Sequence, residues 1–73
     1  MEKVGEVLHY AKSHMLIIRL RREIKENDVL YLKDGRAIGR IIEVFGPIAS
    51  PYAAVRTPIL NIVKGEELFA DRN

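Results

Sequence analysis

The 73-residue sequence contains no cysteine. Neither a disulfide nor a thiolate metal site can therefore supplement the core. This matters because a domain of this length buries only about 60% of the surface of its unfolded chain. The two histidines, His9 and His14, cannot complete a tetrahedral zinc site without carboxylates. We therefore predict a protein with no metal and no other cofactor, whose small core depends on apolar packing.

Long apolar runs and long runs of one charge are also missing. No segment reaches the roughly 18 apolar residues that a membrane helix needs, and residues 1–5 lack the apolar centre of a signal peptide. The 12 basic residues nearly balance the 10 acidic ones, so a basic tail is not indicated. We expect a cytoplasmic protein without membrane contact. The composition is that of a globular protein, and we expect residues 1–73 to form one domain.

Motifs for catalysis are absent as well. Neither Ser13 nor Ser50 lies in the Gly-x-Ser-x-Gly pattern of a nucleophile elbow. The glycines are scattered and form no phosphate-binding loop. The adjacent carboxylates Glu66 and Glu67 follow a turn, where solvated charge is ordinary. The sequence therefore predicts a binding protein and not an enzyme.

Apolar residues occur in short runs rather than in helical stripes. In the clearest run, residues 15–20, apolar side chains alternate as in a half-buried strand. Further strands are predicted over residues 4–11, 29–32, 37–45, 52–57 and 67–70. The polar link Lys12-Ser13-His14 predicts a hairpin, residues 22–28 predict a loop, and residues 59–63 are ambiguous between a strand and an irregular wrap. This spacing, without a helix, predicts a small all-β fold that closes into a barrel and leaves no exposed edge.

The strand over residues 37–45 has two special features. Asp34-Gly35 precedes it and predicts a two-residue type I′ turn, because both residue types tolerate positive φ. Its apolar alternation is imperfect. A bulge near Gly39 would reset the register and turn Ile38 and Ile41, and at the far end Val44, inward.

An apolar stretch continues from this strand into the loop that follows. Loops normally carry polar residues, and a core this thin cannot bury the whole stretch. Its residues either cap one end of the barrel or form an exposed patch that docks a partner protein. We favour docking, because a tyrosine beside a rigid proline suits an interface. The predicted partner-binding residues are Phe45, Gly46, Pro47, Ile48, Pro51 and Tyr52.

Basic residues follow the strand over residues 15–20. Arg19, Arg21, Arg22 and Lys25 are candidate RNA-proximal residues, because together they could follow a phosphate backbone. Acidic residues interrupt the series, and no aromatic residue lies within it to stack on a base. A solvated strand face is the preferred interpretation, and direct RNA binding stays an alternative.

Three groups of residues are similar to a known family. Ile38-Gly39-Arg40 is followed by Glu43-Val44-Phe45-Gly46-Pro47 and then by Pro51-Tyr52. An opening Val4-Gly5-Glu6-Val7-Leu8-His9 leads to Leu16-Ile17-Ile18-Arg19-Leu20, and Gly65-x-x-Leu68-Phe69 closes the pattern. Over residues 4–70 the chain thus resembles the GAR-type accessory proteins of H/ACA ribonucleoproteins. The Phe-Gly-Pro…Pro-Tyr spacing is the most specific part, and the missing Gly/Arg-rich tails point to the archaeal form.

The resemblance implies a six-stranded split barrel like that of translation elongation factors. It implies a stable partner, the dyskerin-like pseudouridine synthase subunit that carries the catalytic aspartate. The guide RNA and the other proteins of the complex would be contacted only indirectly. The implied role is to promote loading and release of substrate RNA during rRNA pseudouridylation in ribosome biogenesis. A direct RNA-binding barrel and a translation-type or ribosome-assembly-type barrel remain as alternatives.

Overall fold

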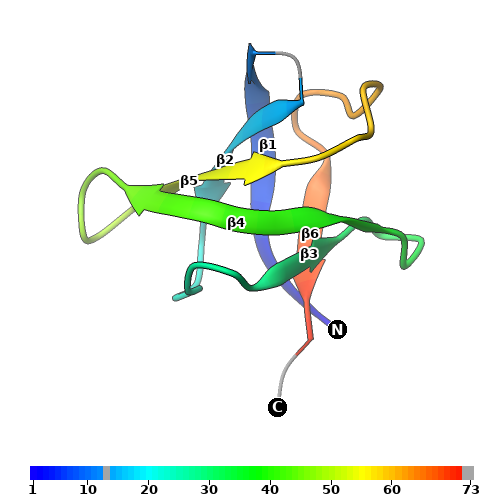
Figure 1. The fold of residues 1–73 in the computed structure, drawn as a ribbon. Helices are drawn as coiled ribbons and strands as arrows, with labels where there is room; N and C mark the ends of the chain where they lie inside the picture. Colours follow the sequence, from blue (N-terminus) through cyan, green and yellow to red (C-terminus); the bar gives the residue numbers. More distant parts are fainter. Residues whose placement is uncertain (13, 72–73) are drawn as a thin grey trace.

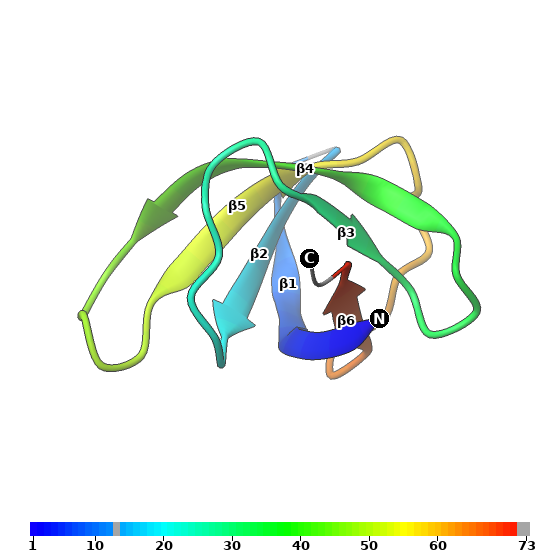
Figure 2. The same cartoon turned by 90° about the horizontal axis from the view of Figure 1, so that it is seen from below.

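The computed structural model describes residues 1–12 and 14–71, and these form six strands without a helix. Every pair of neighbouring strands is antiparallel. The strand order β1-β2-β5-β4-β3-β6 closes the sheet into a barrel (Figures 1 and 2). The strands are β1 (Glu2–Lys12), β2 (Met15–Leu20), β3 (Val29–Tyr31), β4 (Ala37–Phe45), β5 (Tyr52–Arg56) and β6 (Glu67–Ala70). The predicted six-stranded all-β barrel is confirmed.

The strand bounds follow the prediction closely. β2, β4 and β6 begin and end at the predicted residues, whereas β3 and β5 each end one residue earlier than predicted. β1 begins before the predicted residue 4 and extends through Lys12, which pairs with Met15. The predicted hairpin between β1 and β2 is therefore confirmed, although Ser13 of its link lies outside the described residues. Residues 59–63 form no strand.

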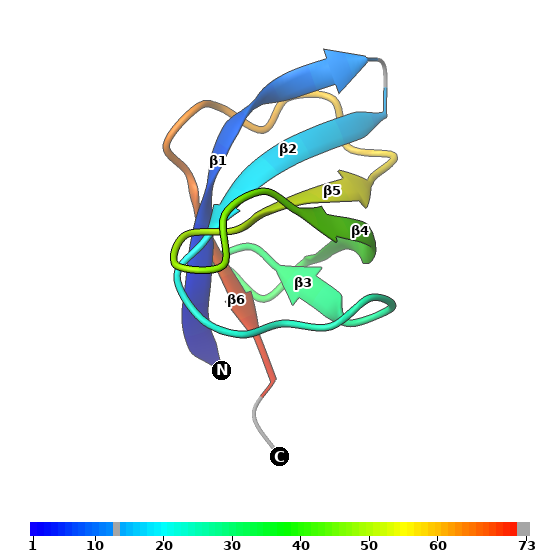
Figure 3. The same cartoon turned by 90° about the vertical axis from the view of Figure 1, so that its left-hand side faces the viewer.

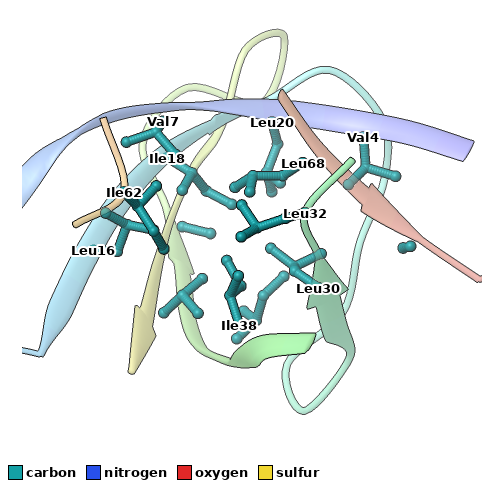
Figure 4. Close-up of a cluster of buried hydrophobic side chains, with 14 residues drawn as sticks. Val4, Val7, Leu16, Ile18, Leu20, Leu30, Leu32, Ile38, Ile62 and Leu68 are labelled. Carbon is teal, nitrogen blue, oxygen red and sulfur yellow. The ribbon is translucent and has the colours of Figure 1, made fainter. Parts of the chain in front are cut away.

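The core is built from the inward-facing side chains of all six strands. In β2, burial alternates with a period of two, as expected when one strand face packs against the interior. Figure 4 shows these side chains converging inside the barrel. The buried apolar residues are Val4, Val7, Leu16, Ile18, Leu20, Leu30, Leu32, Ile38, Ile41, Ala53, Val55, Ile62, Leu68 and Ala70.

Strand β4 contains two register shifts. The first lies where Gly39 pairs with Leu30 and Ala37 with Tyr31. The second lies between Ile41 and Glu43 in the pairing with β5. Ile38 and Ile41 are fully buried while Val44 is partly buried, so the predicted inward set and the bulge near Gly39 are confirmed. Gly39 is required here, because a Cβ would lie 2.0 Å from the backbone oxygen of Arg56.

The turn between β3 and β4 differs from the prediction. A type I′ turn needs positive φ at both central residues, but of Asp34 and Gly35 only Gly35 has one, at 93°. The Gly35 N–H donates to the Leu32 carbonyl at 2.9 Å, and the Leu32 N–H donates to the Arg36 carbonyl at 2.8 Å. The loop thus has three residues and ends on a left-handed glycine. Asp34 keeps negative φ, and its carboxylate accepts from the Arg36 N–H at 2.9 Å.

Residues 57–66 wrap the outside of the barrel before β6 begins. The Tyr10 hydroxyl donates to the Ile59 carbonyl and accepts from the Ile62 N–H at 3.3 Å. The Ile62 side chain is buried in the core. The buried Thr57 hydroxyl accepts from the Ile59 N–H at 3.1 Å. The hydrogen bonds of Tyr10 and the burial of Ile62 therefore hold in place a segment that has no strand pairing.

Candidate functional site: the loop between β4 and β5

Residues 45–52, here called the 45–52 loop, project from the barrel between β4 and β5. Figures 1 and 2 show this loop extending beyond the strands on one side of the molecule, and in Figure 3 the loop faces the viewer. Phe45 and Tyr52 form the last register pair of β4 and β5. Their ring centroids lie 5.9 Å apart with the planes tilted by 39°, a geometry that aromatic pairs favour. The loop therefore starts and ends on one aromatic pair.

Most side chains of the 45–52 loop point away from the core. Ile48 at its tip is 100% exposed, and Phe45 is 38% exposed. Gly46 and Pro47 are also exposed, whereas Pro51 and Tyr52 are half-buried. All six predicted partner-binding residues thus lie outside the buried core, and the structure brings them together in one loop. A fully exposed isoleucine in an apolar loop is the kind of surface that marks an interaction site.

Arg19 of β2 supports the loop from the neighbouring strand. Its guanidinium lies 5.3 Å from the centre of the Tyr52 ring, close enough for a cation–π interaction. Its two terminal nitrogens donate to the Ser50 hydroxyl at 3.1 Å and to the Tyr52 hydroxyl at 3.3 Å. The sequence alone indicates only an RNA-proximal position for Arg19. Its contact with Tyr52 depends on the register of β2 against β5, which the sequence does not reveal.

The backbone of the loop is also held in place. Gly46 has a φ of 91°, and a Cβ there would lie 2.8 Å from Cδ2 of Tyr52. The Ser50 N–H donates to the Pro47 carbonyl at 3.2 Å, and the Leu20 N–H donates to the Pro51 carbonyl at 2.9 Å. Two prolines with fixed φ add further restraint. The exposed apolar residues are therefore presented by an ordered loop.

Two adjoining surface hollows lie between the 45–52 loop and the end of β2. Both include Leu20, Arg21 and Ala49 in their walls. One continues to Glu6, Arg19 and Ser50, and the other to Arg22, Glu23, Ile48 and Pro51. An exposed apolar tip thus stands beside a groove with charged walls.

The other predicted RNA-proximal residues do not form a free cationic strip. Arg21 forms an ion pair with Glu6 at 2.7 Å, and Arg22 pairs with Glu2 at 3.5 Å. Lys25 is exposed; its backbone N–H donates to the Asp28 carboxylate at 3.0 Å, and its carbonyl accepts from the Asp28 N–H at 3.1 Å. Intramolecular partners therefore hold the three arginines of the predicted strip.

Two carboxylates have perturbed acidity. A hydrogen bond from Lys3 lowers the pKa of Glu67, and the backbone N–H of Arg36 lowers the pKa of Asp34. Both carboxylates lie in ion pairs on the surface, at 3.0 Å. A surface ion pair stabilises the charged form of an acid and needs no catalytic role to explain it.

The histidines considered as metal ligands lie in separate settings. His9 is exposed in β1, while Nδ1 of His14 lies 3.2 Å from the Thr57 carbonyl oxygen. In residues 1–12 and 14–71, no three His, Asp or Glu side chains gather as a metal site would require. The same residues contain no helix with the length and apolar character to cross a membrane.

The fold and the site define a class of protein, the small closed antiparallel β-barrel with an ordered, exposed apolar loop. Within this class, the sequence profile described as the Gar1/Naf1 RNA binding region matches residues 1–71. The chain belongs to this family. The resemblance to the GAR-type accessory proteins is thereby confirmed.

Two archaeal proteins, both described as uncharacterized, are similar to the chain. The protein from Methanocaldococcus jannaschii is 40% identical over 50 residues, which cover 68% of this chain and 60% of that protein. The protein from Methanothermobacter thermautotrophicus is 27% identical over 56 residues, which cover 77% of this chain and 61% of that protein. The matched segments thus span less than two thirds of either relative.

Proposed function

We propose that the chain is a non-catalytic protein subunit of an H/ACA guide ribonucleoprotein. In this role it binds the dyskerin-like pseudouridine synthase subunit through the 45–52 loop and acts in the cytoplasm. It promotes loading and release of substrate RNA during rRNA pseudouridylation, while the synthase carries out the chemistry. Membership of the Gar1/Naf1 RNA-binding-region family supports this association.

The full exposure of Ile48 on an ordered loop carries the proposal of protein docking. Burying an isoleucine side chain contributes roughly 1.5–3 kcal/mol. The loop is already ordered by Gly46, by the prolines and by the Arg19–Tyr52 contact, so binding would cost little further conformational entropy. The groove beside Ala49 could receive polar groups at the rim of such an interface. An apolar centre with a polar rim is the usual arrangement of a protein interface.

The test is affinity capture of the cognate synthase subunit by the full chain and its variants. Ile48→Asp should weaken binding roughly 10- to 100-fold, because it removes apolar burial and adds an unpaired charge to the interface. Pro51→Asp with Tyr52→Asp should weaken it at least as much. Ile48 is fully exposed and does not belong to the buried core. The melting temperature of the Ile48→Asp variant should therefore equal that of the unchanged chain.

The matched control is Leu60→Asp, a change of the same kind at a residue that is 59% exposed in the wrap over residues 57–66. Its binding should equal that of the unchanged chain. If Ile48→Asp and the double variant both retain full capture of the synthase, docking through the 45–52 loop is wrong. Capture of ribosomal subunits in place of the synthase would favour the translation-type barrel.

A further inference from the structure

The outer face of strand β5 continues from the 45–52 loop to a second surface. Ala53 and Val55 point into the core, so Tyr52, Ala54 and Arg56 alternate on the outside. On this face Arg56 pairs with Arg40 of β4. Tyr52 and Arg56 are separated by four residues, which corresponds to about 13 Å along the strand. One face therefore carries aromatic residues at one end and two arginines at the other.

Arg40 and Arg56 are directly opposed and exposed, an arrangement that is unfavourable by itself. Opposed residues on antiparallel strands lie within about 4.5–5.5 Å of each other, and like charges there repel. Neither guanidinium has a hydrogen bond or an ion pair within the described part of the chain. Glu43 of β4, which is in register with Ala54, forms no ion pair with either arginine.

Four other cations among the described residues are neutralised by carboxylates, whereas Arg40 and Arg56 are not. Lys3, Arg21, Arg22 and Arg36 all form ion pairs with carboxylates. Among the cations whose side chains the structure describes, Lys25, Lys33 and Lys64 also lack a hydrogen bond or ion pair for their ammonium groups. However, each of these three lysines lies in a different loop. Among the described side chains, only Arg40 and Arg56 are cations in direct register on two paired strands.

We propose that Arg40 and Arg56 bind phosphate groups of an RNA backbone. A planar guanidinium can donate hydrogen bonds to two oxygens of one phosphate group. Two adjacent guanidinium groups can therefore bind the same phosphate or two consecutive phosphates. A shallow hollow lined by His14, Arg56, Thr57 and Pro58 leaves room for the adjoining nucleotide. Binding an anion would also remove the repulsion between the arginines. An RNA-binding family and a sequence pI of 9.2 agree with this ligand.

This site goes beyond the proposed docking function, because it lies outside the 45–52 loop and needs no protein partner. A partner on Tyr52 and Ile48 would approach the same face from its other end. RNA held by the arginines would then lie beside the docked protein. The two surfaces are separate enough to be tested independently: RNA binding is measured on the chain alone, and docking is measured with the synthase.

The test is fluorescence anisotropy of a labelled 15-nucleotide oligouridylate titrated with the full chain at several KCl concentrations. Removing two phosphate contacts should reduce the slope of log K against log salt by about 1.4, since each contact to single-stranded nucleic acid contributes about 0.7. We expect this reduction for Arg40→Gln with Arg56→Gln. The charge-matched control, Lys25→Gln with Lys64→Gln, should leave most of the slope.

Three results would overturn the proposal. These are equal loss of slope in both double variants, no measurable binding of the unchanged chain at low salt, and equally tight binding of a poly-glutamate peptide. The last result would instead indicate an acidic protein as the ligand. Stronger binding of the oligouridylate than of an RNA hairpin would point to substrate RNA as the source of the phosphates, and the reverse to guide RNA.

A second measurement separates a binding role from a structural one. Because the arginines repel each other, Arg56→Gln alone should raise the melting temperature by about 1–5 °C while it weakens oligouridylate binding. A structural role for Arg56 predicts the opposite shift in melting temperature. A lower melting temperature of the Arg56→Gln variant would therefore contradict the proposal that the two arginines bind an external anion.

Discussion

At the scale of single residues, the 45–52 loop depends on contacts between residues far apart in the sequence. Arg19 reaches Tyr52 and Ser50 across the barrel surface. Sequence reasoning found the apolar loop because proline, isoleucine and aromatic residues cluster there. It missed the support from Arg19, because a charged residue on an outer strand face is ordinarily solvated. Side-chain contacts of this kind become visible only when the strand register is known.

Gly46 offers a test of how tightly the loop is held. Gly46→Ala should lower the free energy of unfolding by more than about 1 kcal/mol, because an alanine at positive φ is strained. Its Cβ would also meet the Tyr52 ring at 2.8 Å. The measurement is urea unfolding followed by circular dichroism.

Gly65→Ala is the matched control for this prediction. Gly65 has a similar φ of 88°, but nothing lies within 4 Å of an added Cβ. The Gly65→Ala variant should therefore lose only the free energy of unfolding that the strained backbone costs. If the two variants lose the same stability, Gly46 and Tyr52 are not in tight contact.

At the scale of strands, short apolar runs between turn residues predicted the bounds of β2, β4 and β6, and in β2 the alternation also predicted which face is buried. The turn before β4 was assigned to the wrong type, since Asp-Gly is compatible with several turns and the choice depends on hydrogen bonds at Asp34 and Leu32. The pairing of Arg40 with Arg56 was not predicted, because it depends on the second register shift in β4. Local pattern specifies a strand, but its partner residues follow from the closed barrel.

The contact between the terminal strands β1 and β6 should depend on pH. The Lys3 hydrogen bond to Glu67, at 3.0 Å, is the main cause of the lowered Glu67 pKa. A lowered pKa in the folded state means that the stabilisation is complete above the ordinary glutamate pKa and is lost as pH falls through the lowered value. Lys3→Met should raise the Glu67 pKa toward its ordinary value, as measured by NMR titration of the side-chain carboxyl carbon.

Lys33→Met gives an internal comparison for this titration. Lys33 also lowers the Glu67 pKa, but through charge alone and as the smallest contribution. Its removal should therefore raise the pKa less than removal of Lys3. An equal rise in the two variants would show that the hydrogen bond from Lys3 contributes nothing of its own.

At the scale of the whole molecule, one continuous core joins all six strands. The buried residues of Figure 4 come from every strand and from the wrap over residues 57–66. The Cα radius of gyration is 10.7 Å, close to the value of about 11 Å expected for a compact chain of this length. The interpretation of residues 1–73 as one domain stays a prediction, which an unfolding experiment can test.

A single core predicts a single cooperative unfolding transition. Circular dichroism of the strands and fluorescence of the tyrosines should give the same midpoint in urea. Tyr10 anchors the wrap, Tyr52 reports on the 45–52 loop, and Tyr31 lies in β3. Separate midpoints for the two signals would mean that part of the barrel unfolds independently.

The pairing of Glu2 with Ala70 has a consequence for the connectivity of the chain. Because the first and last strands are antiparallel neighbours, the start of β1 lies beside the end of β6 at one rim of the barrel (Figure 1). A short linker could join them, and the chain could be cut open at the exposed Asp34-Gly35 turn without unpairing any strand. The architecture thus specifies which strands are neighbours around the ring while leaving open where the polypeptide begins.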